Sequence, residues 1–65
     1  MDNFIERLID EKNEVSARAA KLEVFKMKDD FKQIEPVQQS LLNIQLQAMQ
    51  TYIQCLHERL VWLQK

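Results

Sequence analysis

Residues 41–56, LLNIQLQAMQTYIQCL, combine apolar and amide side chains and contain no charged residue. Apolar residues here and just beyond recur at steps of three and four, the spacing of a helix packed along another helix. These residues are Leu42, Leu46, Met49, Ile53, Leu56, Leu60 and Leu63. Pro36 suits the first position of such a helix, where its missing amide hydrogen is not needed. The pattern predicts one long helix over residues 36–63.

A second helix is predicted earlier in the chain. Asn3 and Glu6 have the spacing of a capping box, in which the Asn3 side chain accepts a hydrogen bond from the Glu6 amide. From there the steps of three and four pass through Ile5, Leu8, Lys12, Val15, Ala19 and Leu22. The period is lost near residue 27, where Asp29 or Asp30 could cap a short extra turn. The short connector that remains makes the two helices antiparallel neighbours.

The composition supports this all-α fold. The chain has 65 residues, no Gly and one Pro, so it lacks the turn residues that sheets require. Residues 1–65 form at most one domain, and a lone chain of this size buries too little surface to be more than marginally stable. We therefore expect an antiparallel two-helix hairpin, with helices at about 3–27 and 36–63, that assembles into a helical oligomer.

The second helix carries an additional apolar line. Leu41, Ala48, Cys55 and Trp62 repeat every seven residues beside the main seam. A two-helix hairpin needs one apolar stripe on each helix, so a second stripe left exposed predicts an association site. Residues 36–57 contain no charged residue, and most of the charged residues of the chain lie in residues 1–35. We expect the first helix to be outer and solvated, and this line to form the oligomer interface.

Several classes of function are disfavoured. The net charge of −1 gives no overall attraction to DNA, RNA or a membrane surface, and the many amides of residues 36–57 argue against a membrane span. The single Cys55 cannot form an internal disulfide, and no segment resembles a signal peptide, which favours a reducing cytoplasm. No spacing indicates a catalytic triad, a phosphate loop or a metal site. We predict a protein that is not an enzyme and has no cofactor or metal, with Cys55 buried and His57 half-exposed.

Three features have both a structural and a ligand-binding interpretation. Lys12 occupies a seam position, either as a register-setting residue whose amine reaches water or pairs with Asp10 or Glu11, or as a cation for an anionic ligand. Met49 is either core or an adaptable part of a ligand site. A line spaced by seven borders the seam, and it either makes interhelical hydrogen bonds or contacts bases and phosphate. Its members are Gln38, Gln45, Tyr52 and Arg59.

Two segments resemble a known family. FIERLIDEKNEVSARAAKLEVF at 4–25 and QQSLLNIQLQAMQTYIQCLHERL at 38–60 are similar to the short phage-encoded helical-hairpin proteins grouped with the anti-CBASS sponges. The second segment has the pattern QQ-x-LL-x-x-Q-x-x-AM-x-x-Y-x-x-x-L-x-x-R. That pattern is carried here by Gln38, Gln39, Leu41, Leu42, Gln45, Ala48, Met49, Tyr52, Leu56 and Arg59.

The resemblance implies a homo-oligomer, often a hexamer, that binds cyclic di- and trinucleotides between protomers. Such a sponge sequesters the messenger in the bacterial host cytoplasm without cleaving it, so the CBASS effector is not activated. The implied lining residues are Arg7, Lys12, Gln45, Met49 and Tyr52. No residue matches the aromatic that precedes the hairpin in better-known sponges. Lys12 can stand for their helix-one lysine, although one helical register places Ile9 there instead. The alternative is a structural coiled-coil adaptor or assembly chaperone that binds partner helices along the Leu41, Ala48, Cys55 and Trp62 line.

Overall fold

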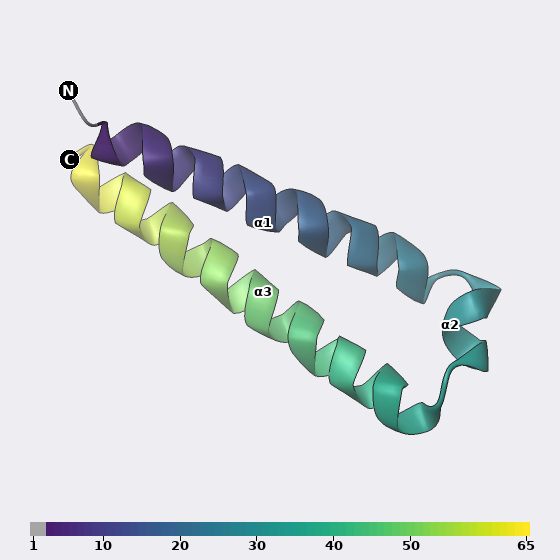
Figure 1. Cartoon of the computed structure of the whole chain (residues 1–65). Coiled ribbons are helices and arrows are strands. Elements are labelled where there is room, and N and C mark those ends of the chain that lie inside the picture. Colours follow the sequence, from purple (N-terminus) through teal and green to yellow (C-terminus); the bar gives the residue numbers. More distant parts are fainter. Residues whose placement is uncertain (1–2) are drawn as a thin grey trace.

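The computed structural model describes residues 3–65 and contains three helices: α1 (Phe4–Lys26), α2 (Asp29–Gln33) and α3 (Pro36–Leu63). The long helices α1 and α3 lie side by side and run in opposite directions, and α2 forms the bend between them (Figure 1). Residues 3–65 include no strand, and within them no helix combines the length and apolarity of a membrane span. The predicted all-α hairpin is confirmed, with one extra short helix in the connector.

The starts of both long helices follow from local chemistry. The Asn3 Oδ1 accepts a hydrogen bond from the Glu6 amide at 3.0 Å, which satisfies one of the unpaired donors at the start of α1. Pro36 occupies the first turn of α3, as expected. One helical turn later, the Gln39 Nε2 donates to the Ile34 carbonyl at 3.0 Å. This bond ties the connector to α3 and fixes where the second long helix begins.

The connector differs in detail from the prediction. Neither aspartate caps the short helix: Lys28 is the N-cap residue of α2 and makes no side-chain capping bond, while Asp29 and Asp30 lie within the first turn. Carboxylates there still interact favourably with the unpaired amides of the helix start. Phe31 of α2 packs edge-to-face on Phe25 of α1, with ring centroids 6.0 Å apart. This aromatic contact holds α2 against the end of α1.

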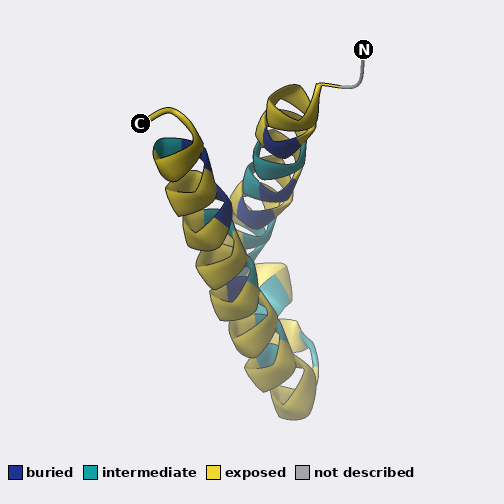
Figure 2. Ribbon diagram, turned by 90° about the vertical axis from the view of Figure 1, so that its left-hand side faces the viewer, coloured by how far each residue is buried: buried dark blue, intermediate teal, exposed yellow. Residues whose placement is uncertain are grey.

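The core lies along the line where α1 and α3 meet, which Figure 2 shows as dark blue bands on their facing sides. Every buried residue belongs to one of the two predicted seams: Leu8, Val15, Ala19, Leu46, Leu56 and Leu60. The seams are less buried at the open end, where Ile5 and Leu63 are exposed because no further helical turn covers them. The predicted seams are therefore correct in their middle parts and too long at that end.

The hairpin is a rod. Its extents are 48 × 16 × 16 Å and its radius of gyration is 15.0 Å, against about 11 Å for a globular domain of this length. The accessible surface of 5221 Å² exceeds the roughly 4,400 Å² that a compact protein of this mass exposes. Within residues 3–65 six apolar side chains are buried, which is a small core for so extended a shape.

Candidate functional site

Two interactions fix the register of α1 against α3 along one side of the hairpin. The Tyr52 hydroxyl donates to the Glu11 Oε2 at 3.1 Å, and the Arg59 guanidinium lies 5.7 Å from the centroid of the Phe4 ring. Both helices advance by seven residues between these contacts, in opposite directions. One further step of seven places Arg18 opposite Gln45. We call this side the Tyr52 face, made of Phe4, Glu11, Arg18, Gln45, Tyr52 and Arg59.

The phenol of Tyr52 is the best-defined group on this face. Its hydrogen bond to the Glu11 carboxylate raises the pKa of Tyr52 above its ordinary value, and partial desolvation and the Glu11 charge act in the same direction. The positive charge of Arg59 acts in the opposite direction. Tyr52 remains 45% exposed, so its ring is accessible while its hydroxyl is held as a donor. An accessible aromatic ring of this kind can stack on a planar ligand.

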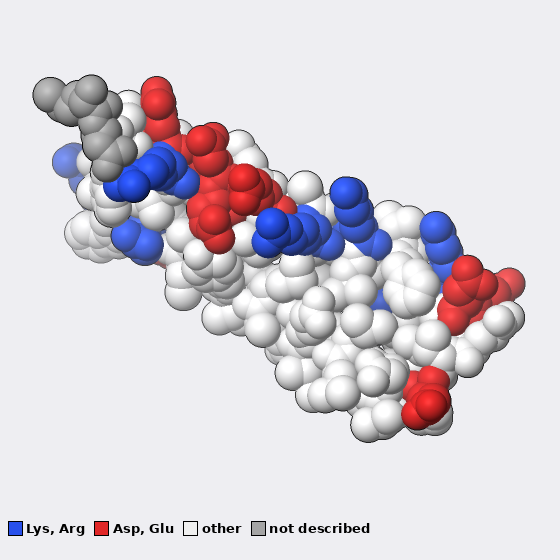
Figure 3. Space-filling model, in the orientation of Figure 1, with Lys and Arg blue, Asp and Glu red and all other residues white. Residues whose placement is uncertain are grey.

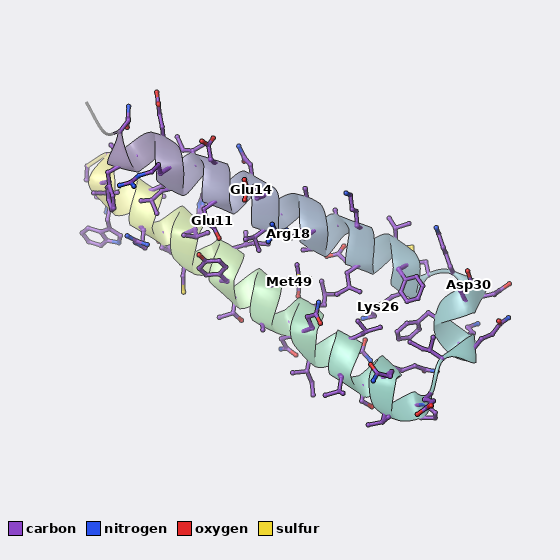
Figure 4. All side chains as sticks on the ribbon, in the orientation of Figure 1. Glu11, Glu14, Arg18, Lys26, Asp30 and Met49 are labelled. Carbon is purple, nitrogen blue, oxygen red and sulfur yellow. The ribbon has the colours of Figure 1, made fainter. Side chains whose placement is uncertain are left out.

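Arg18 supplies a cation on the same face, seven residues after Glu11 along α1. Glu11, Glu14 and Arg18 follow one another along α1, and Met49 lies on the side of α3 toward α1 (Figure 4). In the space-filling view the acidic and basic groups adjoin on the middle of α1, above an uncharged stretch of α3 (Figure 3). No hydrogen bond or ion pair joins the exposed Arg18 to another residue within 3–65. Its guanidinium is thus available to an anion.

The opposite flank of the hairpin has different chemistry. Lys12 follows Glu11 by one residue and is therefore turned by about 100° around α1. Its Nζ lies 3.4 Å from the His57 Nδ1 of α3, so the expected pairing of Lys12 with Asp10 or Glu11 is replaced by a contact across the hairpin. As an acceptor from an ammonium, the His57 Nδ1 must be unprotonated, with any ring proton on Nε2. Lys12 thus has a structural partner in the folded chain.

The candidate lining residues consequently fall in several places. Gln45 and Tyr52 share the Tyr52 face, and Met49 is partly buried between the helices next to them. Arg7 is exposed one helical turn before Glu11, while Lys12 lies on the opposite flank. The sequence interpretation overlooked Glu11 and Arg18 as members of the site. The signal was present, because Phe4, Glu11, Arg18 and Phe25 repeat every seven residues opposite the line of Gln38, Gln45, Tyr52 and Arg59.

All four residues of the line predicted as the oligomer interface are exposed in the single chain. Its four residues belong to a longer run with steps of three and four along the outer side of α3, which we call the outer seam. It consists of Val37, Leu41, Ile44, Ala48, Thr51, Cys55, Glu58 and Trp62. Ile44 is 64% and Trp62 is 67% exposed, large values for such side chains. Cys55 is exposed as well, so the expectation that it is buried is wrong for the chain alone.

No other feature of the described residues resembles a built site. A shallow pocket of about 300 Å³ near the bend is lined by Glu23, Lys26, Met27 and Leu46. The pocket has one acidic residue, Glu23, and one basic residue, Lys26. The Glu23 Oε1 already accepts a hydrogen bond from the Gln50 Nε2 at 3.0 Å. Among residues 3–65 no three His, Cys, Asp or Glu side chains converge as metal ligands. The Tyr52 face and the outer seam are therefore the candidate functional surfaces of the described residues.

The fold and these two surfaces define a class: a short helical hairpin with an unpartnered apolar seam next to a polar face that carries an aromatic ring and a cation. Residues 2–61 match the family model named Sequestin, and the chain belongs to the Sequestin family. That name is consistent with a protein that sequesters. No curated protein and no solved structure was found to match the chain.

Proposed function

We propose that this protein is a phage-encoded sponge that binds a cyclic oligonucleotide messenger, a cyclic di- or trinucleotide, and sequesters it without cleavage. In the bacterial cytoplasm this would keep the messenger from the CBASS effector. The observation that carries the proposal is membership of the Sequestin family over residues 2–61, since the family name denotes sequestration. The resemblance of segments 4–25 and 38–60 to anti-CBASS sponges supplies the nature of the ligand.

Sequestration makes modest chemical demands, and the hairpin can meet them. A sponge lowers the free concentration of a ligand when its sites outnumber the ligand and its Kd is below the ligand concentration. No bond is broken, so no general base, nucleophile or metal is required. The Tyr52 ring can stack on a base, the Gln45 amide can hydrogen-bond to a base edge, and the Arg18 guanidinium can hold a phosphate.

The proposal includes self-association. The outer seam is the surface for this role, because a hairpin with six buried apolar side chains has a small core and leaves Ile44 and Trp62 largely exposed. The sponge resemblance favours a hexamer. The single chain is a thin rod, and assembly into an oligomer would give a more compact particle.

The outer seam favours one alternative function. A helix face with apolar residues at steps of three and four is also the surface that a partner helix of another protein would contact. A coiled-coil adaptor or assembly chaperone would use the same residues and would need no small ligand. Ligand binding is therefore the property that separates the two functions.

Calorimetric titration of the full chain with a panel of cyclic di- and trinucleotides tests the proposal. Linear dinucleotides, mononucleotides and pyrophosphate-linked nucleotides serve as comparators of similar charge. We expect at least one cyclic compound to bind with a submicromolar Kd and to be recovered intact after the protein is heat-denatured. A folded oligomer that binds no member of the panel would overturn the proposal and favour the adaptor.

Two matched variants locate the site within the same titration. Tyr52→Ala removes the ring of the Tyr52 face, and Lys12→Ala removes the cation of the opposite flank. We expect Tyr52→Ala to weaken binding by tenfold or more, on the order of the loss of one stacked base. The Lys12→Ala variant should bind nearly as well as the natural protein, because its amine faces His57.

A further inference from the structure

Charges alternate in sign along the Tyr52 face. Glu11 lies level with Tyr52, to which it is hydrogen-bonded, and Arg18 follows Glu11 by seven residues toward the bend. Arg59 follows Tyr52 by seven residues toward the open end of the hairpin. Seven residues of helix span about 10 Å, so one acidic group lies between two basic groups along the axis. A ligand with phosphates therefore fits this face best with its phosphates near the arginines and an uncharged part against Glu11.

The centre of this face combines an aromatic ring with a carboxylate at its edge. The Tyr52 hydroxyl donates to the Glu11 Oε2 at 3.1 Å, and the Tyr52 side chain is 45% exposed. A base stacked on this ring can therefore bring one of its edges to the carboxylate. A carboxylate has about four acceptor sites, and the phenol occupies one of them. Within residues 3–65 no group donates to the Glu11 Oε1, so this oxygen can accept from a ligand.

The common bases differ in what they offer to a carboxylate. An ionised carboxylate only accepts hydrogen bonds, and two adjacent donors match its two oxygens, as in its pairs with arginine. Guanine has such an edge, with the N1–H beside the N2 amino group. Adenine and cytosine each set an amino group beside a ring nitrogen that is an acceptor, and uracil has one N–H between two carbonyls. An acceptor facing the carboxylate is repelled, so the Glu11 side chain favours guanine.

We propose that Glu11 determines base specificity: the Tyr52 face binds a guanine stacked on the Tyr52 ring, with its N1 and N2 donors on the Glu11 carboxylate. The inference rests on the proposed function and narrows the ligand to cyclic oligonucleotides that contain guanine. Arg18 and Arg59, on either side of the base, hold the phosphates. The hydrogen bond from Tyr52 has a second role in this site, because it keeps the carboxylate at the edge of the ring.

Calorimetric titration with pairs of compounds of equal ring size and charge tests the specificity. One pair is cyclic di-GMP and cyclic di-AMP, and the other is cyclic AMP-AMP-GMP and cyclic tri-AMP. In each ring size that binds, we expect the compound with guanine to bind at least tenfold more tightly, since a bidentate contact to a base discriminates on this scale. Equal affinity within a pair that binds would overturn the inference.

The Glu11→Gln variant tests the role of the carboxylate directly, because an amide of nearly the same size replaces one acceptor by a donor. An amide matches the adjacent donor and acceptor of adenine, so the preference for guanine should be lost or inverted. A purely structural role of Glu11 would instead weaken both compounds of a pair alike. The matched control Glu14→Gln removes the same charge three residues further along α1 and should leave the ratio of the two affinities unchanged. Circular dichroism of both variants verifies that α1 and α3 remain folded.

The outcomes separate this inference from the proposed function. Tight binding of cyclic nucleotides without a preference for guanine, or a preference that persists in Glu11→Gln, would overturn the role of Glu11 and leave the sponge function standing. Binding of no cyclic nucleotide by the folded natural protein would overturn both. The ratio of affinities within a pair thus reports on Glu11, and the affinity itself reports on sequestration.

Discussion

Tyr52 and Glu11, 41 residues apart in the chain, meet across the hairpin through a hydrogen bond of 3.1 Å from the phenol to the carboxylate. This bond joins the two long helices on the side where the candidate ligand residues lie. It also orients the Tyr52 ring so that its hydroxyl faces α1 and much of the ring stays accessible. Its removal should therefore be detectable both in the titration of the phenol and in the stability of the hairpin.

The first prediction concerns that titration. The Glu11→Gln variant should lower the pKa of Tyr52 toward its ordinary value of 10.0, because the charged acceptor that favours the neutral phenol is removed. Tyr52 is the only tyrosine, so ultraviolet absorbance of the tyrosinate reports this group alone. The control Glu14→Gln removes a nearby carboxylate that does not contact the phenol. An equal shift in both variants would contradict the hydrogen bond.

The same bond makes stability depend on alkaline pH. Because folding raises the pKa of Tyr52, its contribution to stability is fully present below about pH 10 and is lost as the pH rises through the raised value. Tyr52→Phe cannot titrate and should lose less stability over this alkaline window. Thermal unfolding of both proteins at pH values on either side of 10 measures the difference. Parallel curves for the two proteins would show that the phenol is not linked to folding.

The third prediction concerns Lys12, which lies on the seam of α1 that packs against α3. Lys12 occupies a partly buried position between apolar residues and has only the 3.4 Å contact with His57 as compensation. Lys12→Leu should stabilise the hairpin by about 1 kcal/mol, since an apolar side chain gains burial there at the cost of an exposed polar contact. Urea unfolding of the two proteins at equal chain concentration tests this. A less stable Lys12→Leu would show that the Lys12 contact is the stronger contribution.

The fourth prediction concerns the core. Leu56 is 2% exposed and belongs to the buried cluster with Leu8 and Leu60, so Leu56→Ala should cost roughly 2–5 kcal/mol. A core this small has little stability to spare, and substantial unfolding at room temperature is expected. The matched control Leu63→Ala, at a position 45% exposed, should change stability by less than about 1 kcal/mol. Circular dichroism during heating measures both.

The fifth prediction concerns the predicted oligomer interface. Leu41→Glu places a charge on the outer seam and should shift the protein toward the monomer in sedimentation velocity experiments, because a buried unpaired carboxylate is costly. Asn43→Asp also adds a carboxylate, but no residue of the outer seam lies three or four positions from Asn43, so this variant should leave the assembly unchanged. Equal dissociation by both variants would point to general charge repulsion instead of this interface.

The long helices and the inner core follow from the sequence because period and caps agree there. The steps of three and four, the Asn3 cap and Pro36 together define helices that the structure places at Phe4–Lys26 and Pro36–Leu63. The connector was less predictable, since a five-residue helix such as α2 depends on the tertiary contact between Phe25 and Phe31. Local spacing contains no information on that contact.

The candidate site was only partly predictable for a related reason. The period of seven in α3 identifies Gln45 and Tyr52 as neighbours on one line, but the register between the helices decides which α1 residues join them. The spacing of residues within one helix does not show how that helix is aligned with the other. The contact of Lys12 with His57 likewise depends on the register, and this is why Lys12 was expected beside its sequence neighbours Asp10 and Glu11.

Pairing of chains through the exposed outer seam would depend on the concentration of the protein. A surface that is covered only when two chains meet gives a dimer population that rises with the square of chain concentration while chains are dilute. Any property that depends on the covered state therefore rises more steeply than the amount of protein that is made. The exposed Cys55 thiol lies on this surface, so in the proposed assembly its reactivity would fall as chains pair.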